Sequence, residues 1–286
     1  MVYGKRFCVS LLVAVGILSA VAQWAPAMRP SAKYDKLPSD YKLQYDSLNI
    51  TTADNARLTG WLCKPALVKN DSVLIIMASS DGGNMSGNLP MVDGLVKNLG
   101  IPVLMFDYRG YGTSDKIVID TDMLAMTEFT IDIFQAVQWA IRDPRTKGKK
   151  IVIYGRSMGA SLAIVVSGVF GGVDGIIAES PYVTQQALTD MISQRNKQAN
   201  IKRQIGFIKS SLLEPIELAS RCSAKLLLLH GQNEEVISTD DIYKLYTAYK
   251  APSKSLWIAA DTRHLEIPYK ETAQFVTAVY TFISSL

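Results

Sequence analysis

Short apolar runs recur along the chain and predict strands that are covered on both faces. Six of them span residues 73–78, 102–106, 151–154, 175–178, 225–229 and 255–259. Near-continuous apolar runs of this length are typical of parallel sheets, which carry helices on both faces. Upstream, residues 43–50 and 56–63 flank a turn at residues 53–55, which predicts an antiparallel hairpin. The pattern therefore predicts a mostly parallel sheet of about eight strands, with the N-terminal hairpin at one side.

Segments with helical periodicity lie between these runs. The clearest covers residues 122–142, and others cover 158–169, 240–249 and 268–286. Strands that alternate with helices are typical of an α/β domain. Residues 181–222 break the alternation, because two helix-like segments, 184–196 and 201–213, follow each other with no strand between them. We expect this insertion to form a small helical cap over the carboxyl ends of the strands, where ligands bind in open α/β sheets.

The first 22 residues have the pattern of a secretory signal peptide. Lys5 and Arg6 precede an apolar stretch at residues 7–22, which ends in the small residues Ala20 and Ala22. This order predicts cleavage before Gln23 and export, either to a periplasm or out of the cell. The alternative is an uncleaved anchor that tethers the protein to a membrane, although a span needs about 20 apolar residues. Residues 23–40, rich in Pro, Ser and Lys, are then a linker, and residues 41–286 form the domain.

Composition agrees with one folded domain and argues against nucleic acid as a partner. The chain is 48% hydrophobic with a net charge of +4, which excludes a disordered protein. Its pI is near 8.8, but loss of Lys5 and Arg6 with the signal would lower the net charge to +2. No other run of basic residues supplies a nucleic-acid footprint. Of the three cysteines, we expect Cys63 and Cys222 to be two separate buried thiols.

A strand, the pattern G-x-S-x-G and an apolar helix follow one another at residues 151–169. The pattern reads Gly155-Arg156-Ser157-Met158-Gly159. In this context it is typical of a nucleophile elbow, a sharp turn that lifts a serine hydroxyl above the carboxyl edge of a sheet. Ser157 is therefore the candidate nucleophile. The amide of Met158, at the start of the helix, is a candidate donor to an oxyanion.

A serine nucleophile needs an adjacent base, and the whole chain has only two histidines, His230 and His264. His264 lies in the loop between the last strand and the last helix, whereas His230 ends a strand. Hydrolases with an elbow of this kind carry nucleophile, acid and histidine in that chain order. With His230 as base, Glu179 would be the acid. We favour His264, because the last loop then supplies the base.

The acid that orients His264 is expected after the strand at residues 225–229. Glu234 is the favoured candidate, and Glu235 and Asp240 are the alternatives. The acid holds the imidazole in the required tautomer and stabilises the imidazolium, and glutamate has the chemistry for this task. A second oxyanion donor is expected from the loop at residues 79–85, where the backbone amide of Ser80 or Asp81 is the candidate.

The sequence resembles the α/β-hydrolase family, in particular its serine-aminopeptidase-like, monoglyceride-lipase-like and depalmitoylase-like branch. The resemblance covers almost all of residues 45–286. It is carried by residues 106–114 (FDYRGYGTS), which are similar to a D-x-R-G-x-G-x-S signature, and by residues 154–159, 179–182 and 229–234. It implies that His230 is structural, that the acid stands at Glu234 in place of the usual Asp, and that His264 is the catalytic histidine. One departure is Ser79-Ser80, where relatives usually carry His-Gly, so that the identity of the second oxyanion donor stays open.

These residues predict an exported serine hydrolase that forms an acyl-enzyme. A carboxylic-ester hydrolase is the favoured interpretation. A peptidase or amidase on the same triad is the second, because the fold and the triad do not separate ester from amide chemistry. A non-catalytic binding protein with this fold is the third, motivated by Glu234 and Ser79-Ser80, and an acyl transferase is the last. The expected partner is a small acyl ester or a peptide, with no nucleic acid, no metal and no organic cofactor. No stable membrane partner is expected unless the signal is uncleaved.

Overall fold

The computed structural model describes residues 28–118, 127–198 and 213–286. The predicted signal peptide therefore lies outside the described residues. The same holds for the first part of the helix expected at 122–142 and for most of the helix-like segment expected at 201–213.

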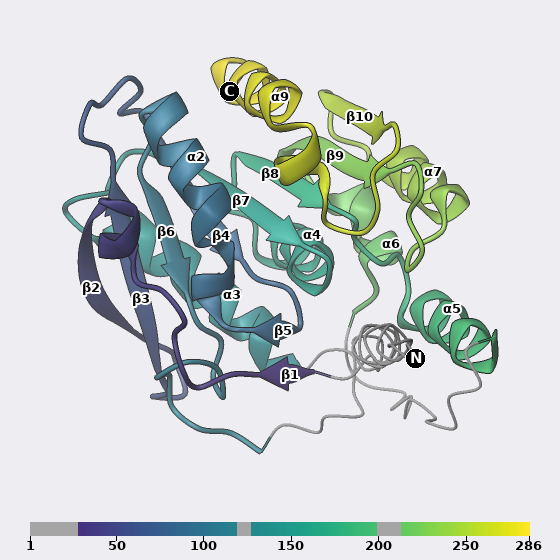
Figure 1. The fold of residues 1–286 in the computed structure, drawn as a ribbon, viewed down its shortest axis with the longest axis horizontal. Coiled ribbons are helices and arrows are strands. Elements are labelled where there is room, and N and C mark those ends of the chain that lie inside the picture. Colours follow the sequence, from purple (N-terminus) through teal and green to yellow (C-terminus); the bar gives the residue numbers. More distant parts are fainter. Residues whose placement is uncertain (1–27, 119–126, 199–212) are drawn as a thin grey trace, which may run out of the picture.

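One eight-stranded sheet forms the centre of the molecule (Figure 1). Its spatial order is β10-β9-β8-β7-β4-β6-β3-β2, in which β2 and β3 pair antiparallel, β3 meets β6 antiparallel, and all other neighbours are parallel. This is the predicted sheet with the N-terminal hairpin at one side. The strands are β2 (Gln44–Thr51), β3 (Arg57–Lys64), β4 (Val73–Ala78), β6 (Val103–Phe106), β7 (Lys150–Arg156), β8 (Gly175–Glu179), β9 (Lys225–Gly231) and β10 (Lys254–Ala259).

Helices cover both faces of this sheet, as the fully buried strand residues require. The helices α3 (Thr127–Arg142), α4 (Met158–Phe170) and α7 (Thr239–Ala248) contribute to one apolar core. The helices α2 (Leu89–Leu99) and α9 (Thr272–Ser284) contribute to a second core on the other face. The remaining helices are η2 (Pro38–Tyr41), η3 (Met85–Asn88), α5 (Gln185–Gln198), α6 (Pro215–Leu218), η4 (Ala219–Arg221) and α8 (Ile267–Lys270).

Helix α2 was not among the expected elements. Its buried residues Leu89, Val92 and Val96 follow helical spacing. Pro90 stands in its first turn, and Gly100 ends it in a left-handed conformation with φ 63°. The expected C-terminal helix is also divided, because the backbone leaves helical geometry at Glu271, between α8 and α9.

The described part of the expected linker packs onto the domain. Met28 is only 1% exposed. Strand β1 (Arg29–Pro30) pairs in parallel with β5 (Gly82–Gly83), within the loop that follows β4. Main-chain pairing of this kind needs no apolar side chains, which is why a segment rich in Pro, Ser and Lys can take part in it. We call residues 28–34 the N-terminal strap.

Cys63 and Cys222 are both buried and free, as expected for two separate thiols. Within residues 28–118, 127–198 and 213–286, no helix is long and apolar enough to cross a membrane.

Candidate active site

The turn from β7 into α4 places Ser157 at the carboxyl edge of the sheet. Ser157 has φ 50° and ψ −114°, a conformation that L-residues rarely adopt. Only glycine fits at two neighbouring positions. A Cβ on Gly155 would lie 2.4 Å from the Ala160 Cα, and one on Gly159 would lie 2.1 Å from the Ala78 carbonyl oxygen. The glycines of the sequence pattern therefore allow the close contact between α4, β7 and β4 that holds Ser157 in this strained turn.

A chain of hydrogen bonds links Ser157, His264 and Glu234. The Nε2 atom of His264 lies 3.2 Å from the Ser157 Oγ, and its Nδ1 atom lies 2.9 Å from each carboxylate oxygen of Glu234. A carboxylate only accepts, so Nδ1–H is the donor to Glu234. The lone pair of Nε2 then faces the Ser157 hydroxyl, which is the arrangement a general base requires.

Glu234 lies in the turn after β9, and its side chain is fully buried. Besides His264, its carboxylate accepts hydrogen bonds from the Ser180 hydroxyl at 2.8 Å and from the Val236 amide at 2.9 Å. Ser180 was not predicted to belong to the site. Its position directly after the buried strand β8, at the same edge of the sheet, is the signal that could have indicated it.

The alternative candidates lie elsewhere in the site or outside it. The Glu235 carboxylate accepts a hydrogen bond from the main-chain amide of His264 at 3.5 Å. Asp240 lies in the first turn of α7. His230 is fully buried, and its Nε2 atom lies 3.3 Å from the Thr239 hydroxyl. Glu179 is paired with Arg156. The hydrogen-bond chain that starts at the Ser157 hydroxyl thus runs through His264 to Glu234. Glu179 contacts Ser157 through the main chain, where its carbonyl oxygen accepts from the Ser157 amide at 2.8 Å.

Burial and mutual attraction act in opposite directions on the pKa values of this pair. Burial alone would lower the pKa of His264, but the hydrogen bond and charge of Glu234 outweigh it and raise that pKa above its ordinary value. Burial alone would raise the pKa of Glu234, but the hydrogen bond and charge of His264 outweigh it and lower that pKa below its ordinary value. Both shifts favour a charged carboxylate beside an imidazole that readily takes up a proton.

The expected oxyanion donors flank the elbow. Met158 is the first residue of α4, so its amide has no intrahelical acceptor. The loop after β4 lies against the start of α4, since a Cβ on Gly159 would also meet the Ser79 carbonyl oxygen at 2.5 Å. This contact brings the residues that follow Ser79, including Ser80 and Asp81, to the side of the elbow. The Asp81 carbonyl oxygen accepts hydrogen bonds from the Tyr111 hydroxyl at 2.9 Å and from the Arg29 amide at 3.0 Å.

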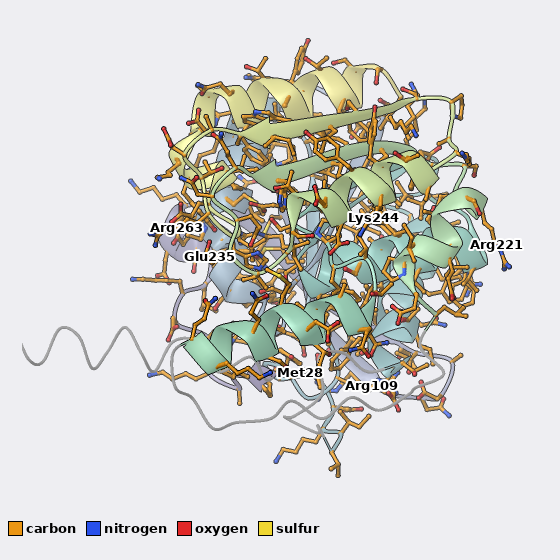
Figure 2. All side chains as sticks on the ribbon, turned by 90° about the vertical axis from the view of Figure 1, so that its right-hand side faces the viewer. Met28, Arg109, Arg221, Glu235, Lys244 and Arg263 are labelled. Carbon is orange, nitrogen blue, oxygen red and sulfur yellow. The ribbon has the colours of Figure 1, made fainter. Side chains whose placement is uncertain are left out.

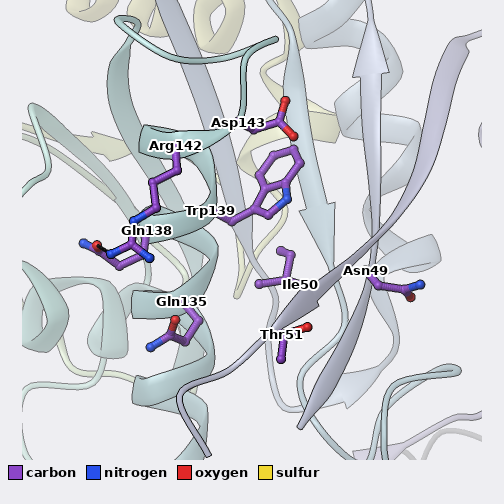
Figure 3. Close-up of a pocket in the computed structure, with 8 residues that line it drawn as sticks. All are labelled: Asn49, Ile50, Thr51, Gln135, Gln138, Trp139, Arg142 and Asp143. Atoms are coloured by element: carbon purple, nitrogen blue, oxygen red, sulfur yellow. Dashed lines mark hydrogen bonds between the residues drawn. The ribbon is translucent and has the colours of Figure 1, made fainter. Parts of the chain in front are cut away.

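Helix α5, one of the described elements within the expected cap at residues 181–222, packs near the same edge. A narrow crevice separates it from the segments that follow β8 and β9, and its lining is largely apolar: Tyr182, Val183, Ala187, Leu188, Met191, Val236, Ile237, Ser238 and Asp241. A second hollow, of about 360 Å³, lies between β2 and α3, beside Thr51 and Trp139 (Figure 3). Because β2 is the outermost strand at the opposite end of the sheet from β10, this second hollow is separate from the cluster around Ser157.

Comparison with known proteins finds a family model similar to part of the chain, and several similar proteins. Residues 85–218 match a family model described as serine aminopeptidase, S33. The uncharacterized protein YfhR of Escherichia coli O157:H7 is 26% identical over 236 residues, which cover 81% of this chain and 78% of that protein. An uncharacterized membrane protein of Saccharomyces cerevisiae is 22% identical, over 82% of this chain and 77% of its own length.

Solved structures share the fold. The esterase Pf2001 of Pyrococcus furiosus superposes with a TM-score of 0.76 at 19% sequence identity, over 91% of this chain and 98% of its own. Its likeness, the family match and the strand order agree with the resemblance found in the sequence. The chain thus has the α/β-hydrolase fold, and its residues 85–218 are similar to the serine aminopeptidase, S33 family.

Proposed function

We propose that this protein is a serine hydrolase that cleaves carboxylic esters through an acyl-enzyme. The observation that carries the proposal is the hydrogen-bond chain from Ser157 through His264 to Glu234. A histidine with no role beyond the surface has no reason to lie partly buried, with its side chain 17% exposed, between a strained serine and a fully buried carboxylate. Perturbed titratable groups gathered around a nucleophile are typical of catalytic sites.

In the proposed reaction, the Ser157 Oγ attacks the ester carbonyl carbon while His264 Nε2 takes the hydroxyl proton. Glu234 stabilises the imidazolium that forms. The oxyanion of the tetrahedral intermediate accepts hydrogen bonds from the Met158 amide and from an amide at Ser80 or Asp81. The C–O bond to the alcohol then breaks, and the alcohol leaves with the proton from His264. Water, deprotonated by the same imidazole, attacks the acyl-enzyme and releases the acid.

The ester is favoured by the likeness to Pf2001, which is an esterase. A peptidase or amidase is the second candidate, favoured by the match to the serine aminopeptidase model.

The test compares p-nitrophenyl esters of increasing acyl length with aminoacyl p-nitroanilides, for the wild type and for Ser157→Ala. We expect ester hydrolysis by the wild type and a loss on the order of 10⁶-fold in the variant. Hydrolysis confined to the anilides would replace the esterase by the peptidase. No turnover of either class would favour a non-catalytic protein.

We also propose that the protein is exported, on the basis of the signal-like residues 1–22. N-terminal sequencing of exported material should begin at Gln23. A chain that still begins at Met1 would favour the membrane-tethered alternative.

A further inference from the structure

Arg156 stands directly before Ser157, and its side chain is buried with 8% exposure. A buried guanidinium is costly unless its donors and its charge are matched. Its Nε donates to Glu179 at 2.9 Å, one terminal nitrogen donates to the Asn88 side chain at 3.1 Å, and the other donates to the Leu265 carbonyl at 2.8 Å. The hydroxyl of Tyr269 lies 3.3 Å from the first of these terminal nitrogens.

These partners belong to the segments that carry the proposed chemistry. Leu265 follows His264 in the chain and has φ 60°, a left-handed conformation that is strained for a leucine. The hydrogen bond from Arg156 to its carbonyl therefore holds the loop of His264 in an unfavourable backbone shape. On the other side, Asn88 donates to the Ser79 hydroxyl at 2.9 Å, at the start of the loop expected to supply the second oxyanion donor.

The charge of Arg156 is balanced from within the sheet. Glu179 ends β8 and is fully buried, and its Oε2 atom also accepts from the Tyr154 hydroxyl at 3.1 Å. Burial alone would lower the pKa of Arg156, but the charge of Glu179 outweighs it and keeps the guanidinium protonated. The three directions in which the planar guanidinium donates are thus fixed by one anion, one amide and one carbonyl.

We propose that Arg156 is a positioning residue, which holds the His264 loop and the loop after β4 in register with the nucleophile elbow. This inference rests on the proposed function, because the distance that Arg156 would control is the one between the Ser157 Oγ and the His264 Nε2. It also gives Ser79 a role: its hydroxyl is the acceptor through which the loop after β4 joins this network.

The test changes the guanidinium and one of its partners separately. Arg156→Lys keeps the positive charge beside Glu179 but cannot donate in three fixed directions. We expect kcat for the best ester to fall at least tenfold with KM changed less than about threefold, because misplacement by about 1 Å costs up to about 10²-fold in rate. Asn88→Ala should also lower kcat. In the double variant, kcat should fall by a smaller factor than the product of the two single-variant factors, since both changes break the same connection.

Arg109 offers a matched control. It too is a buried arginine, bonded to the buried carboxylate of Asp132 and to Asp54. Figure 2 shows it away from Glu235 and Arg263, the chain neighbours of Glu234 and His264. Arg109→Lys should lower the melting temperature, yet leave kcat within about twofold of the wild type at temperatures where the variant is folded.

A second readout does not need turnover. The chain has only two histidines, so the imidazole N–H signals in proton–nitrogen NMR spectra can be assigned to His230 and His264. The Nδ1–H signal of His264, which reports its bond to Glu234, should broaden or shift in Arg156→Lys and persist in Arg109→Lys. An unchanged signal together with a kcat loss no larger than that of Arg109→Lys would overturn the inference.

The two proposals fail in different ways. A wild type without hydrolytic activity whose His264 signal still responds to Arg156→Lys would contradict the proposed function and keep the positioning role. An active wild type in which Arg156→Lys changes neither kcat nor the His264 signal would support the proposed function and contradict the positioning role. Should Arg156→Lys fail to fold, Asn88→Ala decides: a fall in kcat supports the inference, and an unchanged kcat and His264 signal contradict it.

Discussion

At the scale of single residues, the contact between His264 and Glu234 sets the pH range in which the proposed base is available. The imidazole must be neutral to accept the Ser157 proton, and its pKa is raised by Glu234. Activity should therefore increase with pH as the imidazolium loses its proton, with a midpoint above the ordinary histidine value.

The variant Glu234→Gln tests this relation. The uncharged amide no longer favours the imidazolium, so the acid limb of kcat/KM, which reports the free enzyme, should move to lower pH. The amide also allows the wrong tautomer of His264, and kcat should fall by about 10⁴-fold. pH–rate profiles of wild type and variant provide the measurement. A midpoint that stays in place would show that Glu234 does not control the base.

The candidates Ser157, His264 and Glu234 could be named from the sequence because each had a local signal. Ser157 stands in a five-residue pattern with a strand before it, and the chain offers only two histidines. The partners of Arg156 could not be predicted in this way. Asn88 and Leu265 lie 68 and 109 positions away in the chain, and no spacing rule connects a guanidinium to such distant groups.

At the scale of elements, the contact of α4 with β4 and β7 depends on the absence of side chains at the turn. Local sequence predicts this turn well, because the strand, the glycines and the apolar helix are contiguous. Helix α2 was missed although its apolar positions have helical spacing. Its Gly94 is a residue that usually interrupts helices, and the gain that outweighs it is burial against the sheet. Pro90 stands in the first turn, where proline is compatible with a helix.

Gly159→Ala should therefore disrupt the contact between α4 and β4. The new Cβ would lie 2.1 Å from a main-chain oxygen, which cannot rotate away. We expect a loss of about 1–3 kcal/mol in the free energy of unfolding, together with lower esterase activity as the elbow shifts. Chemical denaturation and the ester assay measure the two effects.

Gly94→Ala is the matched control within another helix. A Cβ there meets no atom closer than 3.9 Å, so the variant should gain about 0.5–1 kcal/mol and keep its activity. Equal stability changes in the two variants would refute the role of close contact at Gly159.

At the scale of the whole molecule, the N-terminal strap connects the start of the domain to the candidate site. Strand β1 pairs with β5 in the loop after β4, and the Tyr34 hydroxyl donates to Asp107 at 2.6 Å. Asp107 in turn accepts from the Met85 amide, also at 2.6 Å, which fixes the far end of the same loop. The sequence suggested a linker here because composition does not reveal main-chain pairing.

Removal of the strap should impair catalysis more than binding. A chain that begins at Asp35 loses β1 and Tyr34, so the loop after β4 is held less firmly, and kcat should fall by up to about 10²-fold, as when an oxyanion donor is lost. A chain that begins at Gln23 is the reference. Lys33→Ala, which keeps the main-chain carbonyl that Asn84 contacts at 2.7 Å, is the control. Equal kcat values for the two chain lengths would contradict this role.

The proposed function depends on Ser157 as a nucleophile that His264 and Glu234 activate. Its most direct test is the reaction of the folded protein with a fluorophosphonate, followed by intact-mass analysis and peptide mapping. We expect one adduct per chain, located on Ser157 and abolished in both Ser157→Ala and His264→Ala. A folded wild type that stays unlabelled, or an adduct on another residue, would contradict it.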